Sequence, residues 1–199
     1  MEIEELIARV REGDPNAFEP VIRRFQQKIY LYCCFLLGDK QEAEDAVQEI
    51  FFKAYRGLGS YRHEHSFLAW LYKIASNHCH TLLKRKTRWT LLLPLLRQND
   101  RVRSAEQEFT DREGFRMDWP QGLSPVEKEL LVLRVLEDRP FEEIAGILGH
   151  STAALRKRFE RLKVKLQRIK NGQEEGYHER GPEFLGVDSQ IAGSKNGGN

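Results

Sequence analysis

The feature that most constrains the fold of this chain is an apolar repeat at every third or fourth residue, which continues almost to residue 170. This spacing gathers apolar side chains on one face of an α-helix, and no segment shows the two-residue alternation of a strand. The first long run comprises Phe18, Val21, Ile22, Phe25, Ile29, Cys33 and Leu36, and Gly38 ends it. The sequence therefore predicts an all-α protein.

Capping residues divide this pattern into separate helices. Asp14 precedes a proline, Asp39 opens a segment with an acidic first turn, and Ser66 precedes a third apolar run. Short polar side chains at these positions accept hydrogen bonds from the first free N–H groups of a helix, and acidic residues favour its N-terminus. We expect the third helix to end near Lys84-Arg85-Lys86.

The helical pattern is interrupted once, which predicts two small helical domains joined by a flexible linker. Residues 1–88 form the first domain and 89–122 the linker, a long polar stretch that one compact domain would rarely contain. A capping box at Ser124–Glu127 then opens the second domain, 123–170. Residues 171–199 hold 7 of the 15 glycines and few large apolar residues, so we predict a disordered tail.

Composition limits the class of protein. No apolar run approaches the roughly 20 residues of a membrane-spanning helix, so we expect no membrane insertion. The first residues are acidic and lack the layout of a secretion signal, which predicts a cytoplasmic protein. Three cysteines do not make a disulfide framework.

The net charge of +2 conceals two strongly basic segments. Residues 60–90 carry 6 basic and 1 acidic side chains, and residues 151–170 carry 8 and 1. Acidic segments elsewhere cancel this charge. A single basic run is usually a solvated helix face, but two runs in separate predicted domains favour nucleic-acid binding.

The second domain has the layout of a helix-turn-helix from Phe141 to Glu160. Gly149 suits the sharp turn, and Ser151 or Thr152 caps the second helix. Base contacts are expected from the start of that helix, and phosphate contacts from its other basic positions. The candidates for contact with DNA are Thr152, Ala153, Arg156, Lys157, Arg158 and Arg161. A helical hairpin with a solvated basic face is the alternative.

The first domain combines an acidic helix face with a basic, aromatic segment. The acidic face, outside the apolar stripe, carries Asp45, Gln48, Glu49 and Phe52. The basic, aromatic segment carries Tyr61, Arg62, His63, Phe67, Trp70, Lys73, Asn77, Lys84 and Arg85. Aromatic rings stack on unpaired bases and cations follow the backbone, so the second set suits single-stranded DNA. Taken alone, Phe67 and Trp70 are more typical of a hydrophobic core.

Two stretches resemble the bacterial extracytoplasmic-function (ECF) sigma factors of the sigma-70 family. They are GDKQEAEDAVQEIFFKAYRGLGSYRHEHSFLAWLYKIASN and LSPVEKELLVLRVLEDRPFEEIAGILGHSTAALRKRFERLK. The resemblance covers residues 10–88 and 123–168, and both blocks stand in the family's order and spacing. It departs from the family at Thr81, where an aspartate is frequent, and at Ala154 and Lys157 in the predicted recognition helix.

The resemblance implies a role for each block. The helix around Asp45–Phe52 would dock on the β′ clamp helices of core RNA polymerase. The segment Tyr61–Arg85 would melt the −10 promoter element and capture a flipped base. The helix-turn-helix would read the −35 element, with the linker near the RNA exit path. The implied partners are core RNA polymerase (β′ clamp helices and β flap), promoter DNA and an anti-sigma factor.

Two other functions compete with this hypothesis. A helix-turn-helix regulator without polymerase docking would leave the Asp45–Phe52 face without a role. A metalloenzyme would have to use His63, His65 and the His78-Cys79-His80 run, but His78 and His80 lie about 200° apart around a helix. No common zinc-ligand spacing, phosphate loop or catalytic triad occurs, so the sequence predicts no cofactor, no metal and no enzymatic activity.

Overall fold

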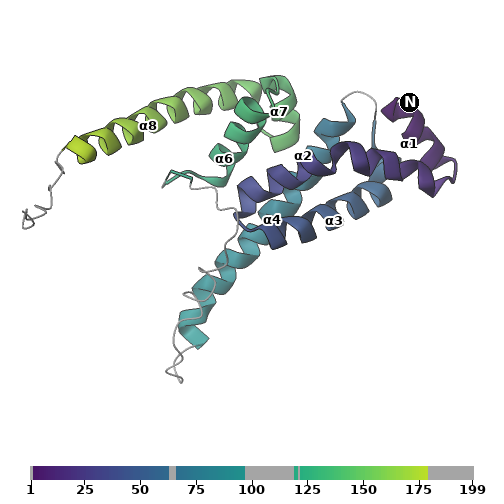
Figure 1. The fold of residues 1–199 in the computed structure, drawn as a ribbon, viewed down its shortest axis with the longest axis horizontal. Coiled ribbons are helices and arrows are strands. Elements are labelled where there is room, and N and C mark those ends of the chain that lie inside the picture. Colours follow the sequence, from purple (N-terminus) through teal and green to yellow (C-terminus); the bar gives the residue numbers. More distant parts are fainter. Residues whose placement is uncertain (1, 63–65, 97–118, 121, 179–199) are drawn as a thin grey trace, which may run out of the picture. The chain divides into compact units, whose positions relative to one another are not determined.

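The computed structural model describes residues 2–62, 66–96, 119–120 and 122–178, with only the backbone of 92–96 and 172–178 (Figure 1). Every regular element among these residues is helical, which confirms the all-α prediction. The first set is α1 (Ile3–Arg11), a 3-10 turn (Pro15–Phe18), α2 (Glu19–Leu37), α3 (Lys40–Gly57), a 3-10 turn (Leu58–Ser60) and α4 (Phe67–Leu96). The second is α6 (Pro125–Leu131), a π-helical turn (Val132–Leu136), α7 (Phe141–Leu148) and α8 (Thr152–His178).

The predicted caps begin and end these helices. Asp39 accepts a hydrogen bond from the backbone N–H of Glu42 at 2.8 Å, and Ser66 accepts one from Ala69 at 3.2 Å. Gly38 ends α2 in the left-handed conformation, with φ of 74°. Each cap satisfies backbone groups that a helix end leaves unpaired, and a polar N-cap contributes about 1 kcal/mol.

The core of the first helices lies where α2, α3 and α4 pack together. Val21 and Ile29 on α2, Ile50 on α3 and Leu71 on α4 are fully buried. Burying a side chain of this size contributes about 1.5–3 kcal/mol. These contacts fix α3 beside α4, and that pair of helices carries the candidate sites of the first domain.

The helix-turn-helix forms as predicted. Gly149 joins α7 to α8 with φ of 69°, and the hydroxyl of Ser151 accepts a hydrogen bond from Ala154 N–H at 3.3 Å. Leu155 and Leu162 on α8 are buried with Ile144 of α7. The apolar seam of α8 therefore faces the core and its basic side faces outward.

Two helices extend beyond their predicted ends. We expected the third helix to run out near Lys86, but α4 continues to Leu96. Thr87 and Thr90 donate hydroxyl hydrogen bonds to carbonyls one turn earlier, so these polar side chains are accommodated within the helix. Similarly, α8 continues past Lys170 to His178. Residues 97–118 and 121 of the predicted linker and residues 179–199 of the predicted tail lie outside the described residues.

The residues up to Leu162 cluster as one compact unit, and those from Lys163 onward form another. In the described part of the chain, no helix is both long enough and apolar enough to cross a membrane.

Candidate nucleic-acid and polymerase interfaces

The predicted docking residues lie on the outer face of α3. Asp45, Gln48, Glu49 and Phe52 are all exposed, and the Phe52 side chain has an exposed fraction of 56%. Arg56 stacks over the Phe52 ring at 5.6 Å, which covers part of this apolar surface with a cation. The buried stripe of α3 occupies its opposite side, so these four residues form a continuous surface available to a partner.

Part of this surface forms one wall of a groove of about 560 Å³ between α3 and α4. Asp45 and Glu49 line the α3 side, whereas Leu82 and Trp89 line the α4 side. Trp89 has an exposed fraction of 57%, which is high for an indole. The sequence interpretation missed Trp89, because it lies beyond the predicted end of its helix.

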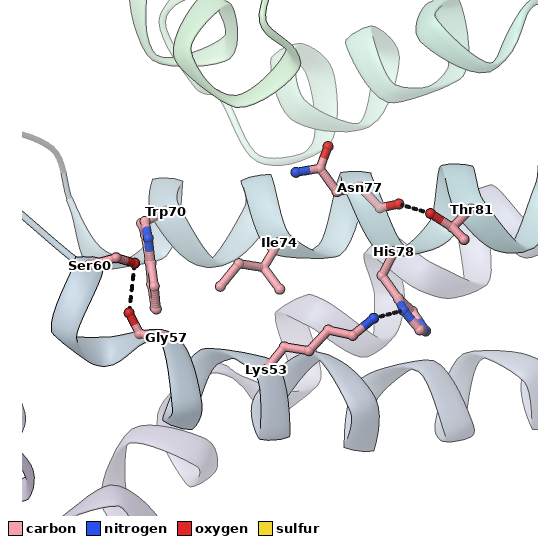
Figure 2. A pocket seen from close by; sticks show the side chains of 8 residues that line it. All are labelled: Lys53, Gly57, Ser60, Trp70, Ile74, Asn77, His78 and Thr81. Carbon is pink, nitrogen blue, oxygen red and sulfur yellow. Dashed lines mark hydrogen bonds between the residues drawn. The ribbon is translucent and has the colours of Figure 1, made fainter.

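A second cavity lies nearby between α3 and α4, with a volume of about 380 Å³ (Figure 2). Its lining residues are Lys53, Gly57, Ser60, Trp70, Ile74, Asn77, His78 and Thr81. This volume is within the range of small-molecule sites and admits a nucleobase. Trp70 and Asn77 were predicted as DNA contacts, so two residues of that prediction meet in one pocket.

Two polar residues of this pocket, Lys53 and His78, contact each other. Figure 2 shows them facing each other from α3 and α4, with Lys53 Nζ 2.6 Å from His78 Nδ1. The ammonium donates to Nδ1, which leaves the ring proton on Nε2. Burial and the charge of Lys53 lower the pKa of His78, so the imidazole is neutral near pH 7. The pocket therefore offers one cation, one neutral ring donor and an indole face.

Asn77 and Thr81 occupy successive turns of α4. The Thr81 hydroxyl donates to the Asn77 carbonyl at 2.8 Å, so its proton is already used within the helix. The side-chain amide of Asn77 is exposed and, in Figure 2, points away from Lys53. An exposed amide of this kind can both donate to and accept from a base edge.

The other predicted aromatic residues lie behind Trp70. Tyr61 and Phe67 have exposed fractions of 1% and 2%, and their ring centroids are 5.4 Å from that of Trp70. The Arg11 guanidinium holds the chain at this point by donating to the Leu58 and Tyr61 carbonyls. In this conformation Tyr61 and Phe67 support the Trp70 ring, and only Trp70 presents an accessible face.

The remaining predicted −10 contacts are exposed cations, with one exception. Arg62, Lys73, Lys84 and Arg85 are all exposed, and Lys84 and Arg85 follow the pocket along α4. His63 lies outside the described residues, as does His65. A row of cations beyond the pocket suits the phosphates of a strand whose base enters it.

The recognition helix α8 presents its predicted contacts to solvent. Ala153, Arg156, Lys157, Arg158 and Arg161 are exposed, and Thr152 is half-buried at the start of the helix. Arg156 differs from the others because it donates to Glu142 of α7 at 2.7 Å and lies 5.7 Å from the Phe141 ring centroid.

The residues of the metal hypothesis point to different partners. His78 bonds to Lys53, Cys79 lies against Cys33 with the sulfurs 3.7 Å apart, and His80 approaches Glu129. The Cys79 contact and burial raise the pKa of the Cys33 thiol, which disfavours the thiolate that a metal needs. Within the residues the structure describes, no group of three His, Cys, Asp or Glu side chains converges on a metal position.

The known proteins that this chain resembles agree with this geometry. Residues 21–89 match the family described as Sigma-70 region 2, and residues 121–166 match Sigma-70, region 4. The chain thus belongs to the sigma-70 family of RNA polymerase sigma factors. Within that family it is a bacterial ECF sigma factor.

Relatives of this group match over different lengths. The ECF RNA polymerase sigma-E factor of Escherichia coli K12 is 28% identical over 170 residues, which cover 79% of this chain and 88% of that protein. The RNA polymerase sigma-H factor of Pseudomonas aeruginosa is 43% identical over 74 residues, covering 37% of this chain. That match spans only 38% of the Pseudomonas protein, and the match to Bacillus subtilis SigW spans 41% of SigW.

Solved structures with this fold include CnrH in complex with the cytosolic domain of CnrY. Its TM-score is 0.60 at 21% identity, and the match covers 84% of this chain and 96% of that one. RpoE of Bartonella quintana, solved in complex with the anti-sigma factor NepR, matches with a TM-score of 0.57 at 18% identity over 77% of this chain and 96% of that one.

Proposed function

We propose that this protein binds core RNA polymerase and directs promoter-specific initiation, reading the −35 duplex with α8 and capturing unpaired −10 bases with the α3–α4 pocket. The observation that carries this proposal is the pocket itself. It places the Trp70 face and the Lys53 cation around a volume that accepts one base, and Asn77 is among its lining residues. Stacking, phosphate pairing and an edge contact are what a flipped base requires.

Opening the promoter requires no chemical step in this scheme. Unpairing and unstacking cost about 2–4 kcal/mol for each captured base, and stacking on an aromatic ring returns about 1–3 kcal/mol. Phosphate contacts from the cations along α4 supply the remainder. We therefore assign the protein a binding role, with no catalytic residue, cofactor or metal of its own.

The α3 groove fits the proposed polymerase contact. The exposed carboxylates of this groove, together with Phe52 on the outer face of α3, would meet basic and apolar residues of the β′ clamp helices. The segment from 123 to 170 would also reach the β flap. A transcriptional regulator without polymerase docking is not favoured, because it leaves this groove without a role. We also propose that an anti-sigma factor regulates the protein, as the complex with the anti-sigma factor NepR suggests for RpoE. We propose that the protein acts in the cytoplasm, where the polymerase is.

Segments 1–88 and 123–170 would act as separate readers, with 89–122 between them. The −10 and −35 elements are about 25 base pairs apart, which is roughly 85 Å at 3.4 Å per base pair. The two readers must therefore separate widely when both are bound to one promoter.

The proposal is tested by adding the 199-residue chain to purified core polymerase and selecting fragments from genomic DNA. We expect the holoenzyme to retain fragments with a common two-part sequence and to make −10 thymines reactive to permanganate without nucleotides. Core polymerase alone is the control. Retention of the same fragments without the chain, or retention without any reactive thymine, would contradict the proposal.

A further inference from the structure

Glu129 is a charged side chain with an exposed fraction of 0%. Its partners come from helices far away in the sequence. The hydroxyls of Tyr32 on α2 and Ser76 on α4 each donate to Glu129 Oε1 at 2.7 Å. His80 Nε2 lies 2.9 Å from Oε2, although its N–H direction does not meet hydrogen-bond geometry. A buried carboxylate is tolerated only with such partners, so Glu129 couples α6 to α2 and α4.

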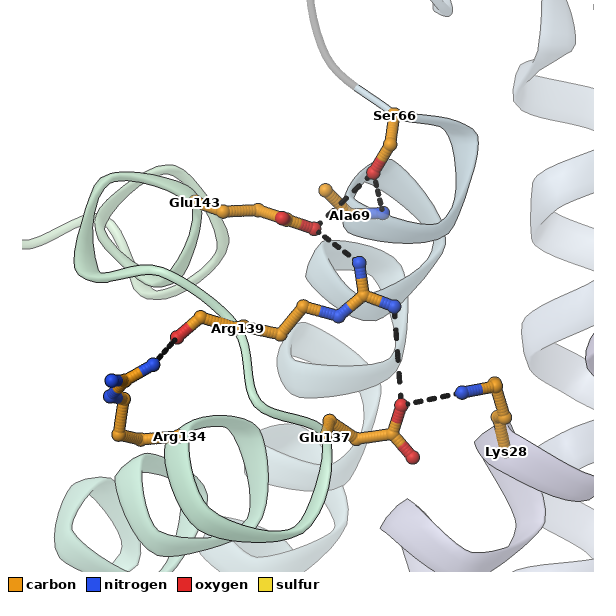
Figure 3. Close-up of polar contacts among 7 residues, drawn as sticks. All are labelled: Lys28, Ser66, Ala69, Arg134, Glu137, Arg139 and Glu143. Carbon is orange, nitrogen blue, oxygen red and sulfur yellow. Dashed lines mark hydrogen bonds and ion pairs between the residues drawn. The ribbon is translucent and has the colours of Figure 1, made fainter.

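A second set of polar contacts links Glu137 and Glu143 with α2 and the start of α4 (Figure 3). Lys28 of α2 pairs with Glu137 at 2.9 Å, and the Ser66 hydroxyl at the start of α4 donates to Glu143 of α7 at 3.2 Å. Arg139 pairs with Glu143 at 3.0 Å. The Lys28 and Ser66 contacts join residues 123–148 to the same helices that Glu129 contacts. The Lys28–Glu137 and Ser66–Glu143 contacts are exposed and each contributes little, so the buried carboxylate is the principal polar contact between these segments.

The same packing places acidic side chains beside part of the −10 reader. A cavity of about 250 Å³ is lined by Arg62, Trp70 and Lys73 on one side and by Glu142 and Glu143 of α7 on the other. Carboxylates therefore lie where the phosphates of a captured strand would approach.

Glu142 also pairs with Arg156 of the −35 reader at 2.7 Å. The first turn of α7 thus contacts residues of both readers. At this separation they cannot occupy promoter elements that are roughly 85 Å apart.

We propose that Glu129 is an intramolecular latch, which holds the helix-turn-helix segment against α2 and α4 and keeps the two DNA-reading surfaces too close together to occupy one promoter until polymerase and promoter separate them. This inference rests on the proposed function. The partner of this face of α2 and α4 is the helix-turn-helix segment of the same chain. The latch lowers the affinity of the free protein for promoter DNA. DNA binding therefore depends on the polymerase.

The latch is tested by fluorescence energy transfer within the full chain. The three cysteines are free and buried, so labels attach selectively to cysteines introduced at Gln26 on α2 and Val135 after α6, both exposed. We expect one high-transfer population in the unsubstituted background. Tyr32→Phe removes one donor to Glu129 but keeps the ring, and Glu129→Gln removes the charge. Each is expected to raise the open-to-closed ratio about tenfold, the effect of losing a hydrogen bond to a charged group.

Tyr55→Phe is the matched control, because Tyr55 is exposed and the substitution also removes one phenol oxygen. It should leave the transfer unchanged. A 30-nucleotide single-stranded DNA of mixed sequence should bind the Tyr32→Phe variant about tenfold more tightly than the control. If Glu129→Gln fails to fold, Tyr32→Phe still decides the question.

Equal transfer in the control and in every folded variant would overturn the latch, as would a low-transfer population before any substitution. Transcription with core polymerase is measured in parallel. Normal transcription with no change in transfer refutes the latch alone, whereas opening of the variants without any specific transcription refutes the proposed function.

Discussion

Replacement of Trp70 with alanine tests the base pocket most sharply. Its indole lines the cavity beside Lys53 and Asn77, and it is the only ring of its cluster that is more than slightly exposed. Stacking of one base on an aromatic side chain is worth about 1–3 kcal/mol. At 1.4 kcal/mol for each factor of ten, Trp70→Ala should weaken capture of a single-stranded −10 strand by about 5- to 150-fold.

The substitution also removes packing, so its structural cost must be measured separately. The Trp70 ring contacts Tyr61 and Phe67 at centroid distances of 5.4 Å, and each aromatic pair contributes about 0.5–1.5 kcal/mol beyond the area buried. Denaturant unfolding of the free protein gives this cost. Trp70→Phe is the control, because it keeps a stacking face at the same position.

The assay uses assembled holoenzyme with a promoter fork whose −10 strand is unpaired, and with the same promoter as a closed −35 duplex. We expect Trp70→Ala to lose affinity for the fork and to bind the duplex normally, and Trp70→Phe to retain most of its fork affinity. An equal loss on both probes, or no loss on the fork in a folded variant, would refute the assignment of this pocket.

Three further predictions concern the other surfaces. Glu49→Lys should weaken binding of core polymerase by about tenfold or more while −35 duplex binding by the free chain is unchanged; a parallel loss in both titrations would contradict the docking assignment. Arg156→Ala should reduce discrimination between −35 sequences, whereas Arg161→Ala should lower affinity equally for all duplexes and reduce its salt dependence. Competition binding measures both effects. The reverse pattern would assign the base contact to Arg161 and the phosphate contact to Arg156. The closed population should decrease as pH rises from 6 to 8, because the Glu129 carboxylate raises the pKa of His80, against burial and the charge of Lys84. Protonated His80 therefore stabilises the closed form below its ordinary pKa, and this contribution is lost as pH rises through the raised value. A pH response that persists in His80→Gln would show that another group is responsible.

Local sequence signals predicted those helix boundaries that depend on one short segment of the chain. The Asp39 cap and the left-handed turns at Gly38 and Gly149 depend only on neighbouring backbone, and all three are confirmed. The end of α4 could not be predicted in the same way, because the polar residues after Lys86 pair with carbonyls of their own helix.

The unpredicted functional residues depend on contacts between distant segments. Glu129 lies among other charged residues at the start of α6, and its burial follows from Tyr32 and Ser76, 97 and 53 residues earlier in the chain. Lys53 and His78 belong to the pocket only because α3 packs beside α4. For such residues, sequence periodicity identifies the exposed face but not which distant helix lies against it.

The central claim is that this chain confers promoter selection on core RNA polymerase, and run-off transcription tests it most directly. Purified chain and core polymerase are mixed with a selected genomic fragment and nucleotides, and RNA 5′ ends are mapped. The account predicts one discrete start site that disappears without the chain and is reduced by Trp70→Ala. Transcripts that start at scattered positions, or the same starts from core polymerase alone, would contradict it.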